Sequence, residues 1–217
     1  EAFLWNAATG TVILPLTDLE GEVNDVAFTS DGSKFATALQ SGETVVWNAA
    51  TGAELERFSR AFSGVYGVAF SPDGSMIVTA DAVGIASLWT STGDPIRDFT
   101  GHTDTINGVD FSPDGSQVLT GSSDGSLRQW NAATGSLVRA LRGHADVVFD
   151  ASFAPGDSTR IVTGSQDGFA RTWQANLGVD LRTLTGHNFH VYAAEYSPDA
   201  TMVLTGGWDH TARLWNA

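Results

Sequence analysis

The sequence predicts an all-β protein built from a repeated antiparallel unit of about 42 residues. Three observations support this. Short segments alternate apolar and polar residues, they are separated by turns rich in Pro, Asp and Gly, and no segment has the length and 3.6-residue periodicity of a helix. Six tryptophans set the period, at spacings of 42, 42, 41, 43 and 42 residues: Trp5, Trp47, Trp89, Trp130, Trp173 and Trp215.

The period that ends at Trp130 shows the unit most clearly. Its first strand is followed by Ser112-Pro113-Asp114-Gly115, whose Pro and Asp-Gly chemistry is typical of a tight turn. A second turn follows at Ser123-Asp124-Gly125. The four strands are predicted at 106–111, 117–120, 126–130 and 136–141. Each period is therefore expected to be a four-stranded meander.

The other periods repeat this plan. Their first strands end at an aromatic residue: Phe28, Phe70, Phe153 and Tyr196. Both faces of such a sheet carry apolar residues, so each sheet must be covered by its neighbours. Radial stacking covers both faces and leaves only short edges.

A known family matches these features. Gly101-His102 at the start of the period, Phe111-Ser-Pro-Asp-Gly115 in the first hairpin, Asp124-Gly125 in the second and a final Trp130 resemble the WD40 repeat. The resemblance implies a β-propeller of four-stranded antiparallel blades. It covers residues 1–217 as one domain, with about five full repeats plus an extra third strand.

The resemblance also implies a structural hydrogen-bond network in each blade, made by a histidine, a Ser or Thr, a turn aspartate and the tryptophan. Three repeats supply all four members: His102, Thr120, Asp124 and Trp130; His144, Thr163, Asp167 and Trp173; His187, Thr205, Asp209 and Trp215. The chemistry fits, because Asp accepts from the imidazole, the hydroxyl bridges and the indole N–H only donates.

The first two full repeats depart from this pattern. Leu19 and Ser41 take the His and Asp places in one, and Ala61 and Val83 take them in the other. Thr37 and Thr79 remain without those partners. We expect these two blades to be looser and to tolerate mutation of the threonine better.

The histidine and aspartate pairs could also be metal ligands or acid–base pairs. Their recurrence every 42 or 43 residues in three repeats favours the structural interpretation, because one chain rarely builds three equivalent active sites. Gly121-Ser122-Ser123-Asp124-Gly125 matches the nucleophile elbow GxSxG, but it lies between two strands rather than between a strand and a helix. We expect no catalytic residue, no metal site, no cofactor and no enzymatic activity.

Charge and composition narrow the partners. The formal charge is -14, from 25 acidic and 11 basic residues, which disfavours phosphate backbones and anionic lipid. We therefore expect neither nucleic acid nor a membrane surface as a partner. The sequence also has no apolar run of 18 residues that could span a membrane. The absence of cysteine does not decide the compartment. With no signal peptide, a cytoplasmic location is the default, and the start at Glu1 suggests that upstream sequence is missing.

Propellers of the resembling family bind proteins or peptides on the top face. Several positions of this sequence match that face and carry side chains suited to binding a partner: Phe149, His190, Tyr192, Trp208, Tyr66, Asn107 and Gln166. Trp208 is the only tryptophan outside the 42-residue spacing, and exposed aromatic clusters are typical of binding hot spots. Alternatively, these rings pack on a neighbouring blade or plug the channel.

The four strands of the repeat do not occur equally often. The third, Trp-bearing strand is predicted six times, and the first, second and fourth strands are each predicted five times. In one arrangement 11–16 completes the last blade beside Trp215, closes the ring and displaces 2–5. In the other, which we favour, the chain is part of a propeller of six to eight blades. An open ring exposes apolar faces and favours homo-oligomers.

The leading functional hypothesis is a non-catalytic scaffold that binds a protein or peptide on the top face. A structural unit of a larger or multimeric assembly is the alternative. An enzymatic or ligand-binding propeller would use the central channel and would require a non-repeating cluster of ionisable residues, which the sequence pattern does not reveal.

Overall fold

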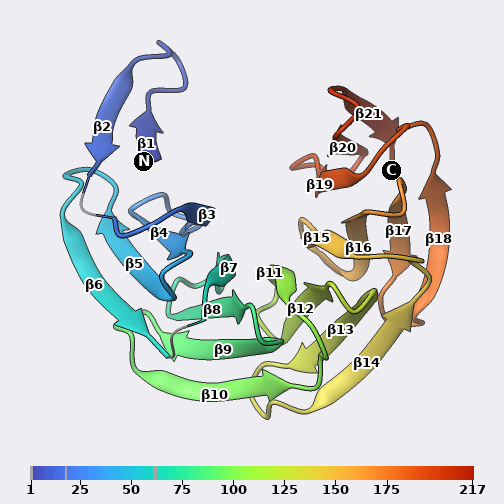
Figure 1. Cartoon of the computed structure of the whole chain (residues 1–217), viewed down its shortest axis with the longest axis horizontal. Helices are drawn as coiled ribbons and strands as arrows, with labels where there is room; N and C mark the ends of the chain where they lie inside the picture. The colour runs from blue at the N-terminus through green and yellow to red at the C-terminus, as the bar shows by residue number, and fades with distance from the viewer. Residues whose placement is uncertain (1, 18, 61–62) are drawn as a thin grey trace.

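The chain forms a curved stack of antiparallel sheets around a central opening (Figure 1). The computed structural model describes residues 2–17, 19–60 and 63–217. Within these ranges there are 21 strands and no helix. The all-β propeller architecture predicted from the sequence is thereby confirmed.

The strands follow one another in chain order. The first hairpin and the next two sheets comprise β1 (Ala2–Trp5), β2 (Val12–Leu16), β3 (Val23–Phe28), β4 (Lys34–Leu39), β5 (Glu43–Asn48), β6 (Glu54–Ser59), β7 (Val65–Phe70), β8 (Met76–Asp81), β9 (Ile85–Thr90) and β10 (Pro95–Thr100). The remaining sheets comprise β11 (Ile106–Phe111), β12 (Gln117–Ser122), β13 (Ser126–Asn131), β14 (Leu137–Arg142), β15 (Val148–Ala154), β16 (Asp157–Ser165), β17 (Ala170–Gln174), β18 (Val179–Leu184), β19 (Val191–Tyr196), β20 (Met202–Gly207) and β21 (Ala212–Asn216).

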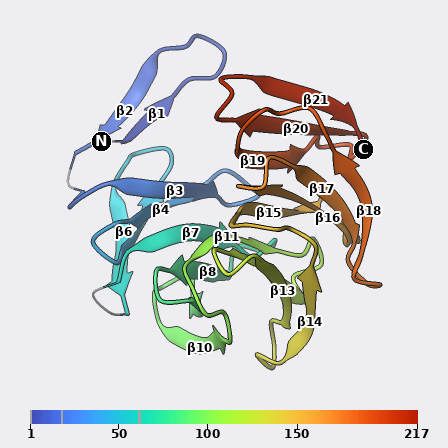
Figure 2. The ribbon, with the colours of Figure 1, turned by 45° about the vertical axis from the view of Figure 1, so that its right-hand side comes forward.

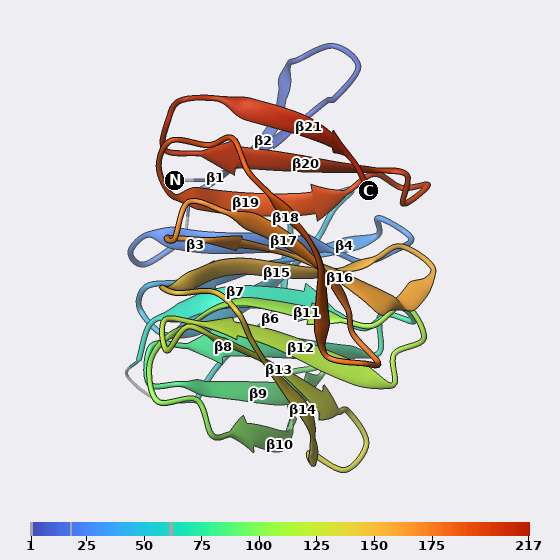
Figure 3. The same ribbon diagram turned by 90° about the vertical axis from the view of Figure 1, so that its right-hand side faces the viewer.

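Four sheets are complete four-stranded blades: β3–β6, β7–β10, β11–β14 and β15–β18. The first strand of each blade lies at the centre and the fourth at the periphery, as Figures 1 and 2 show. Seen from the side in Figure 3, the inner strands β7, β11, β15 and β19 run across the stack one above another. The inner face is therefore built from consecutive first strands.

The first hairpin of each blade closes through an aspartate that accepts local hydrogen bonds. Asp114 Oδ1 accepts from Ser112 Oγ at 2.6 Å and from the Ser116 backbone N–H at 3.0 Å. Gly115 follows at φ +71°, a conformation that favours glycine. The hydrogen bonds from Ser112 and Ser116 lower the pKa of Asp114 to about 2, so the turn holds an ionised carboxylate.

The hydrophobic core lies between neighbouring blades. Leu119 and Leu127 of one blade pack with Phe153, Ile161 and Trp173 of the next, and all five side chains are buried. Burial of such faces is the main stabilising contribution in a fold whose sheets cannot cover themselves.

The ring is open in this structure, with a gap between the β1–β2 hairpin and β19–β21 (Figure 1). Faces beside the gap are uncovered: Phe28 is 52% exposed, whereas the equivalent Phe70 is 8% exposed. Trp5 and Leu214 are 56% and 61% exposed. Strand β2 pairs with β1 in a two-stranded sheet and not with β21, so the closed arrangement considered for 11–16 is not the observed one.

Candidate functional site

One hydrogen-bond chain crosses the β11–β14 blade. Trp130 Nε1 donates to Thr120 Oγ1 at 3.0 Å, and Thr120 Oγ1 lies 2.8 Å from His102 Nε2. His102 Nδ1 lies 2.9 Å from Asp124 Oδ2. Because a carboxylate only accepts, the imidazole donates from Nδ1 and accepts the threonine hydroxyl at Nε2. Both ring nitrogens are therefore engaged inside the blade.

Two further blades repeat this geometry. His144 Nε2 lies 2.7 Å from Thr163 Oγ1, and His144 Nδ1 lies 2.8 Å from Asp167 Oδ2. The corresponding distances from His187 to Thr205 and Asp209 are 2.8 and 3.0 Å. Trp173 and Trp215 each donate to their threonine at 2.9 Å. The structure thus brings together all twelve residues selected from the sequence, in three sets of four.

The charge state of the network follows from burial and hydrogen bonding. Burial lowers the pKa of His102, which favours the neutral imidazole. Burial also opposes ionisation of Asp124, yet hydrogen bonds from Ser126, His102 and Thr103 together hold its pKa well below the usual range. Among the described residues no group of His, Cys, Asp or Glu is arranged to hold a metal ion.

The β3–β6 blade replaces the network with apolar packing. Trp47 Nε1 still donates to Thr37 Oγ1, at 3.1 Å. Leu19, in the histidine place, packs against the buried cluster that contains Leu39 and Val45. The Thr37 hydroxyl therefore keeps its hydrogen bond from Trp47 and is surrounded by apolar side chains.

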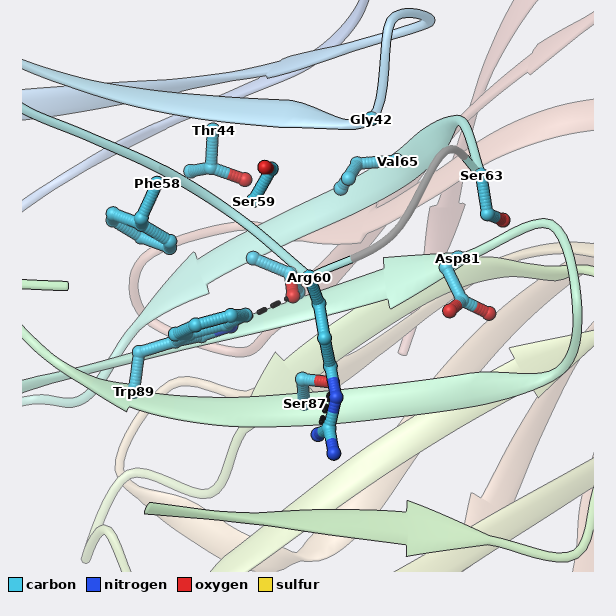
Figure 4. A pocket seen from close by; sticks show the side chains of 11 residues that line it. Gly42, Thr44, Phe58, Ser59, Arg60, Ser63, Val65, Asp81, Ser87 and Trp89 are labelled. Atoms are coloured by element: carbon cyan, nitrogen blue, oxygen red, sulfur yellow. Dashed lines mark hydrogen bonds between the residues drawn. The ribbon is translucent and has the colours of Figure 1, made fainter. Parts of the chain in front are cut away.

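The β7–β10 blade replaces the network differently. Ala61, in the histidine place, lies outside the described residues. Arg60 takes the place that Gly101 has in the next blade, and its guanidinium reaches Ser87 Oγ at 3.3 Å (Figure 4). The same guanidinium pairs with Asp98. A hollow of about 20 Å³ remains beside Trp89, whose indole N–H donates to Thr79 Oγ1 at 2.9 Å.

The sequence match to the nucleophile elbow lies in the turn between β12 and β13. Ser123 Oγ accepts a hydrogen bond from the Asn107 side chain at 3.0 Å, and Asp124 is bound to His102. The turn therefore lies between two strands, as the spacing predicted, and its Asp is engaged in the blade network.

A register shift recurs at the start of each of the five inner strands. In β15 it falls between Val148 and Asp150, and in β19 between Val191 and Ala193. The same irregularity is present in β3, β7 and β11. A β-bulge re-aims the extra side chain. The bulged positions carry Asn24, Tyr66, Asn107, Phe149 and Tyr192.

Four aromatic side chains from the last two sheets form one cluster, here called the aromatic cluster: Phe149, His190, Tyr192 and Trp208. The rings of Phe149 and Tyr192 are 4.5 Å apart, and those of Tyr192 and Trp208 are 5.5 Å apart. His190 lies edge-on to Trp208 at 6.0 Å. Trp208 is nevertheless 56% exposed. Beside it lies a hollow of about 600 Å³ that is also lined by Phe189.

The other predicted face residues lie around this cluster or farther along the ring. The backbone carbonyl of Gln166 accepts from His190 Nδ1 at 2.8 Å. Asn107 is engaged between blades, because its side chain donates to the Val148 carbonyl at 2.9 Å as well as to Ser123. Tyr66 has the bulged position of β7 and is not part of the aromatic cluster.

Sequence reasoning missed a group of carboxylates on the inner face: Asp25, Asp110, Asp150 and Glu195. Burial raises the pKa of Asp110 to about 7 and those of Asp25 and Asp150 to about 6, and burial raises the pKa of Glu195. The sequence analysis did not identify this ionisable cluster, in which Asp25 and Asp150 share one strand position and Asp110 and Glu195 share another. Its signal was the acidic residues at positions three and five of the first strands.

Comparisons with known proteins support the architecture. A family model described as the IFT122 first beta-propeller matches residues 1–216. No curated protein matches the chain. In the part of the chain that the structure describes, no helix is long and apolar enough to span a membrane.

Proposed function

The chain belongs to the IFT122 first beta-propeller family, a group of WD40-type propellers, and we propose from that premise that it binds a protein or peptide on the face carrying the aromatic cluster. The family suggests a protein-interaction scaffold in general terms. The finer proposal is a non-catalytic scaffold whose contact residues are Phe149, His190, Tyr192 and Trp208.

The exposure of Trp208 within a cluster of touching rings supports this proposal most directly. The repeat does not require a tryptophan there, whereas each Trp in a complete blade network donates to a threonine. Large aromatic side chains bury much area with few rotatable bonds, which suits them to binding hot spots. Tyr66, Asn107 and Gln166 would extend the contact along the same face.

The proposal is tested by affinity capture with the wild-type chain and the Trp208→Ala variant, followed by purification of each captured protein and direct measurement of its Kd. Leu181→Ala is the matched control, because Leu181 is exposed on the outer strand β18. We expect loss of about 2 kcal/mol of binding energy for Trp208→Ala and almost none for Leu181→Ala. Unchanged affinity of every purified partner for folded Trp208→Ala contradicts the proposal.

The uncovered faces support a second candidate, a unit of a multimeric assembly. Phe28, Leu204 and Leu214 are each more than half exposed beside the gap. Apolar patches of this kind are typical of interfaces. Light scattering tests it: association that is lost in Leu204→Glu and kept in Leu181→Glu supports an assembly through this face, and a monomer across concentrations contradicts it.

A further inference from the structure

The hollow beside Trp208 lies between two segments of the last sheet, the loop before β19 and the turn between β20 and β21. It has a volume of about 600 Å³, is here called the aromatic hollow, and is lined by Asn188, Phe189, His190, Trp208, Asp209 and His210. Four of these six residues carry aromatic rings. Phe189 and Trp208 are 60% and 56% exposed, so both rings are open to solvent.

Two hydrogen bonds hold the walls of the aromatic hollow together. The Trp208 backbone N–H donates to the His190 carbonyl at 2.9 Å, and the Asn188 N–H donates to Asp209 Oδ2 at 3.2 Å. Asp209 is itself bound to His187 in the blade network. The hollow is therefore formed in advance, and little conformational entropy is lost at its walls when a ligand binds.

Two complete blades have the same backbone frame with other side chains on it. The Ser123 N–H donates to the Thr105 carbonyl at 2.8 Å, and the Gln166 N–H donates to the Val147 carbonyl at 2.9 Å. The residues that match Phe189, Trp208 and His210 are Asp104, Ser123 and Gly125 in the β11–β14 blade and Asp146, Gln166 and Gly168 in the β15–β18 blade. Three departures from the repeat therefore meet at one hollow.

One of these departures disfavours its own turn. His210 has φ +61°, in the region where the matching Gly125 and Gly168 have φ +78° and +86°. A Cβ makes this region unfavourable, so the blade structure alone would favour glycine. Backbone strain of this kind concentrates at functional sites. The strained turn places an imidazole at the rim of the aromatic hollow.

The charge next to the hollow indicates the chemistry of a partner. Asp146 and Asp104 are exposed, and neither belongs to an ion pair among the described residues. The loop of Asp146 connects to the hollow, because the Val147 carbonyl accepts from Gln166 and the Gln166 carbonyl accepts from His190 Nδ1 at 2.8 Å. The surface therefore changes from aromatic to acidic between adjacent blades.

We propose that the aromatic hollow receives one bulky apolar side chain, leucine or phenylalanine, from an extended peptide whose neighbouring lysine or arginine pairs with Asp146. This inference rests on the proposed function and adds the chemistry of the partner and two contact residues, Phe189 and His210. The apolar side chain lies between the Phe189 and Trp208 rings, and the His210 imidazole covers it. The chain's charge of -14 attracts the basic residue and disfavours a second copy of the chain as the occupant.

The probes are short acetylated and amidated Gly-Ser peptides that carry one leucine or phenylalanine and one lysine, separated by a glycine, in both orders. Matched peptides replace the apolar residue by alanine or the lysine by glutamine. Binding to the full 217-residue chain is followed at low salt by the NMR shift of the Trp208 indole N–H and by calorimetry. We expect the leucine or phenylalanine peptide to bind at least about 10-fold more tightly than the alanine peptide.

Variants that approach the residues of the other blades locate the apolar contact while keeping the frame. Phe189→Asn gives a neutral analogue of the aspartate found there in two blades, and His210→Gly restores their glycine. Each is expected to weaken leucine-peptide binding about 5-fold or more. His210→Gly is also expected to raise the melting temperature, because glycine adopts this φ without strain. Leu181→Ala, on the outer strand β18, is the control.

A second pair of variants locates the basic residue. Asp146→Asn keeps the acceptor for the Val147 N–H and removes the charge. It is expected to weaken binding of the lysine peptide about 3-fold or more and to leave the glutamine peptide unchanged. Asp104→Asn is the matched control, because Asp104 has the same loop position one blade farther from the hollow.

Equal binding of the leucine, phenylalanine and alanine peptides overturns the inference, as does unchanged affinity in folded Phe189→Asn and His210→Gly. Equal weakening by Asp146→Asn and Asp104→Asn shows attraction to net charge alone and contradicts the pairing with Asp146. Self-association of the chain that is lost in Phe189→Asn identifies a second copy as the occupant and also overturns it.

The proposed function and this inference fail in different ways. If Trp208→Ala lowers the affinity of a purified partner while Phe189→Asn, His210→Gly and Asp146→Asn do not alter it, the inference fails and the proposed function stands. If the apolar, basic peptides bind selectively and depend on Phe189, yet no partner is lost in Trp208→Ala, the chemistry of the hollow is supported and the proposed function fails.

Discussion

Trp89 donates its indole N–H to Thr79 Oγ1 at 2.9 Å in a blade where Val83 takes the network aspartate's place. The same bond joins Trp130 to Thr120 at 3.0 Å, where His102 also binds the threonine. The Trp–Thr bond thus persists without the rest of the network. The two threonines differ in how many buried groups depend on them.

This difference predicts unequal mutational costs. Thr120→Val leaves both the Trp130 N–H and His102 Nε2 without a partner, so we expect a loss of about 2–4 kcal/mol of unfolding free energy. Thr79→Val leaves only the Trp89 N–H unpaired and should cost about 1–2 kcal/mol. Denaturant melts measure both, with Thr→Ser at each position as the control that keeps the hydroxyl. Equal costs would show that the histidine adds nothing to its blade.

A pair of glycines tests how closely neighbouring blades approach. A Cβ on Gly164 would lie 2.9 Å from the Val191 backbone carbonyl of the next sheet. A Cβ on Gly206, the equivalent position in the sheet beside the gap, would meet its nearest atom, the Ala193 Cβ, at 3.9 Å. We expect Gly164→Ala to destabilise the chain by about 1–3 kcal/mol and Gly206→Ala to change it by less than about 0.5 kcal/mol. Thermal melts of the two variants decide the matter; similar melting temperatures would contradict this packing.

The inner carboxylates predict a pH dependence of stability. Burial raises the pKa of Asp110 from 3.8 to about 7, so the folded state binds its proton more tightly than the unfolded chain does. This contribution is complete below about pH 4 and is lost as the pH rises through about 7. We expect Asp110→Asn to reduce the fall in stability between pH 5 and pH 8 by about 1–3 kcal/mol.

Asp31→Asn is the control for that experiment. Hydrogen bonds from Thr29 and Ser33 lower the pKa of Asp31 to about 2, so its contribution is present above about pH 4 and is lost as the pH falls toward 2. Its variant should therefore leave the slope between pH 5 and pH 8 unchanged. Parallel curves for wild type and Asp110→Asn in that range would contradict the assignment.

Substitution of Arg60 is expected to change the unfolding free energy only slightly. Its side chain is about half exposed, and its pairing with Asp98 and Ser87 lies at the rim of the β7–β10 blade. Exposed ion pairs contribute little, so Arg60→Ala should cost no more than about 1 kcal/mol. His102→Ala removes both bonds of a buried imidazole and should cost about 2–4 kcal/mol. Denaturant titration of the two variants compares them, and a larger loss for Arg60→Ala would show that the substitute pair supports its blade strongly.

Much of the fold was predictable because its determinants are local and repeated. The tryptophan spacing and the Asp-Gly turns located the meanders, and β11, predicted at 106–111, has those bounds in the structure. The open ring was one of two alternatives, since strand patterns do not say whether 11–16 pairs with β1 or with β21.

The sites were harder to read. Phe149, Tyr192 and Trp208 could be selected as exposed aromatics, but their ring contacts depend on bulges that the sequence does not mark. Asp25 and Asp110 have different positions in their strands, so no repeat alignment places them in one pocket. Their proximity is a property of several blades together.

The recurring bulge places one side chain of each inner strand outside the His–Thr–Asp–Trp network of its blade. The same bulged position of the inner strand has a different side-chain environment in each sheet. The residues there are Asn24, Tyr66, Asn107, Phe149 and Tyr192. Two of these side chains connect blades, since Asn24 donates to the Val65 carbonyl and Asn107 to the Val148 carbonyl, whereas Phe149 and Tyr192 belong to the aromatic cluster. The same backbone irregularity therefore serves two ends, connection between blades where it carries asparagine and ring contacts at the inner strands β15 and β19 where it carries an aromatic residue.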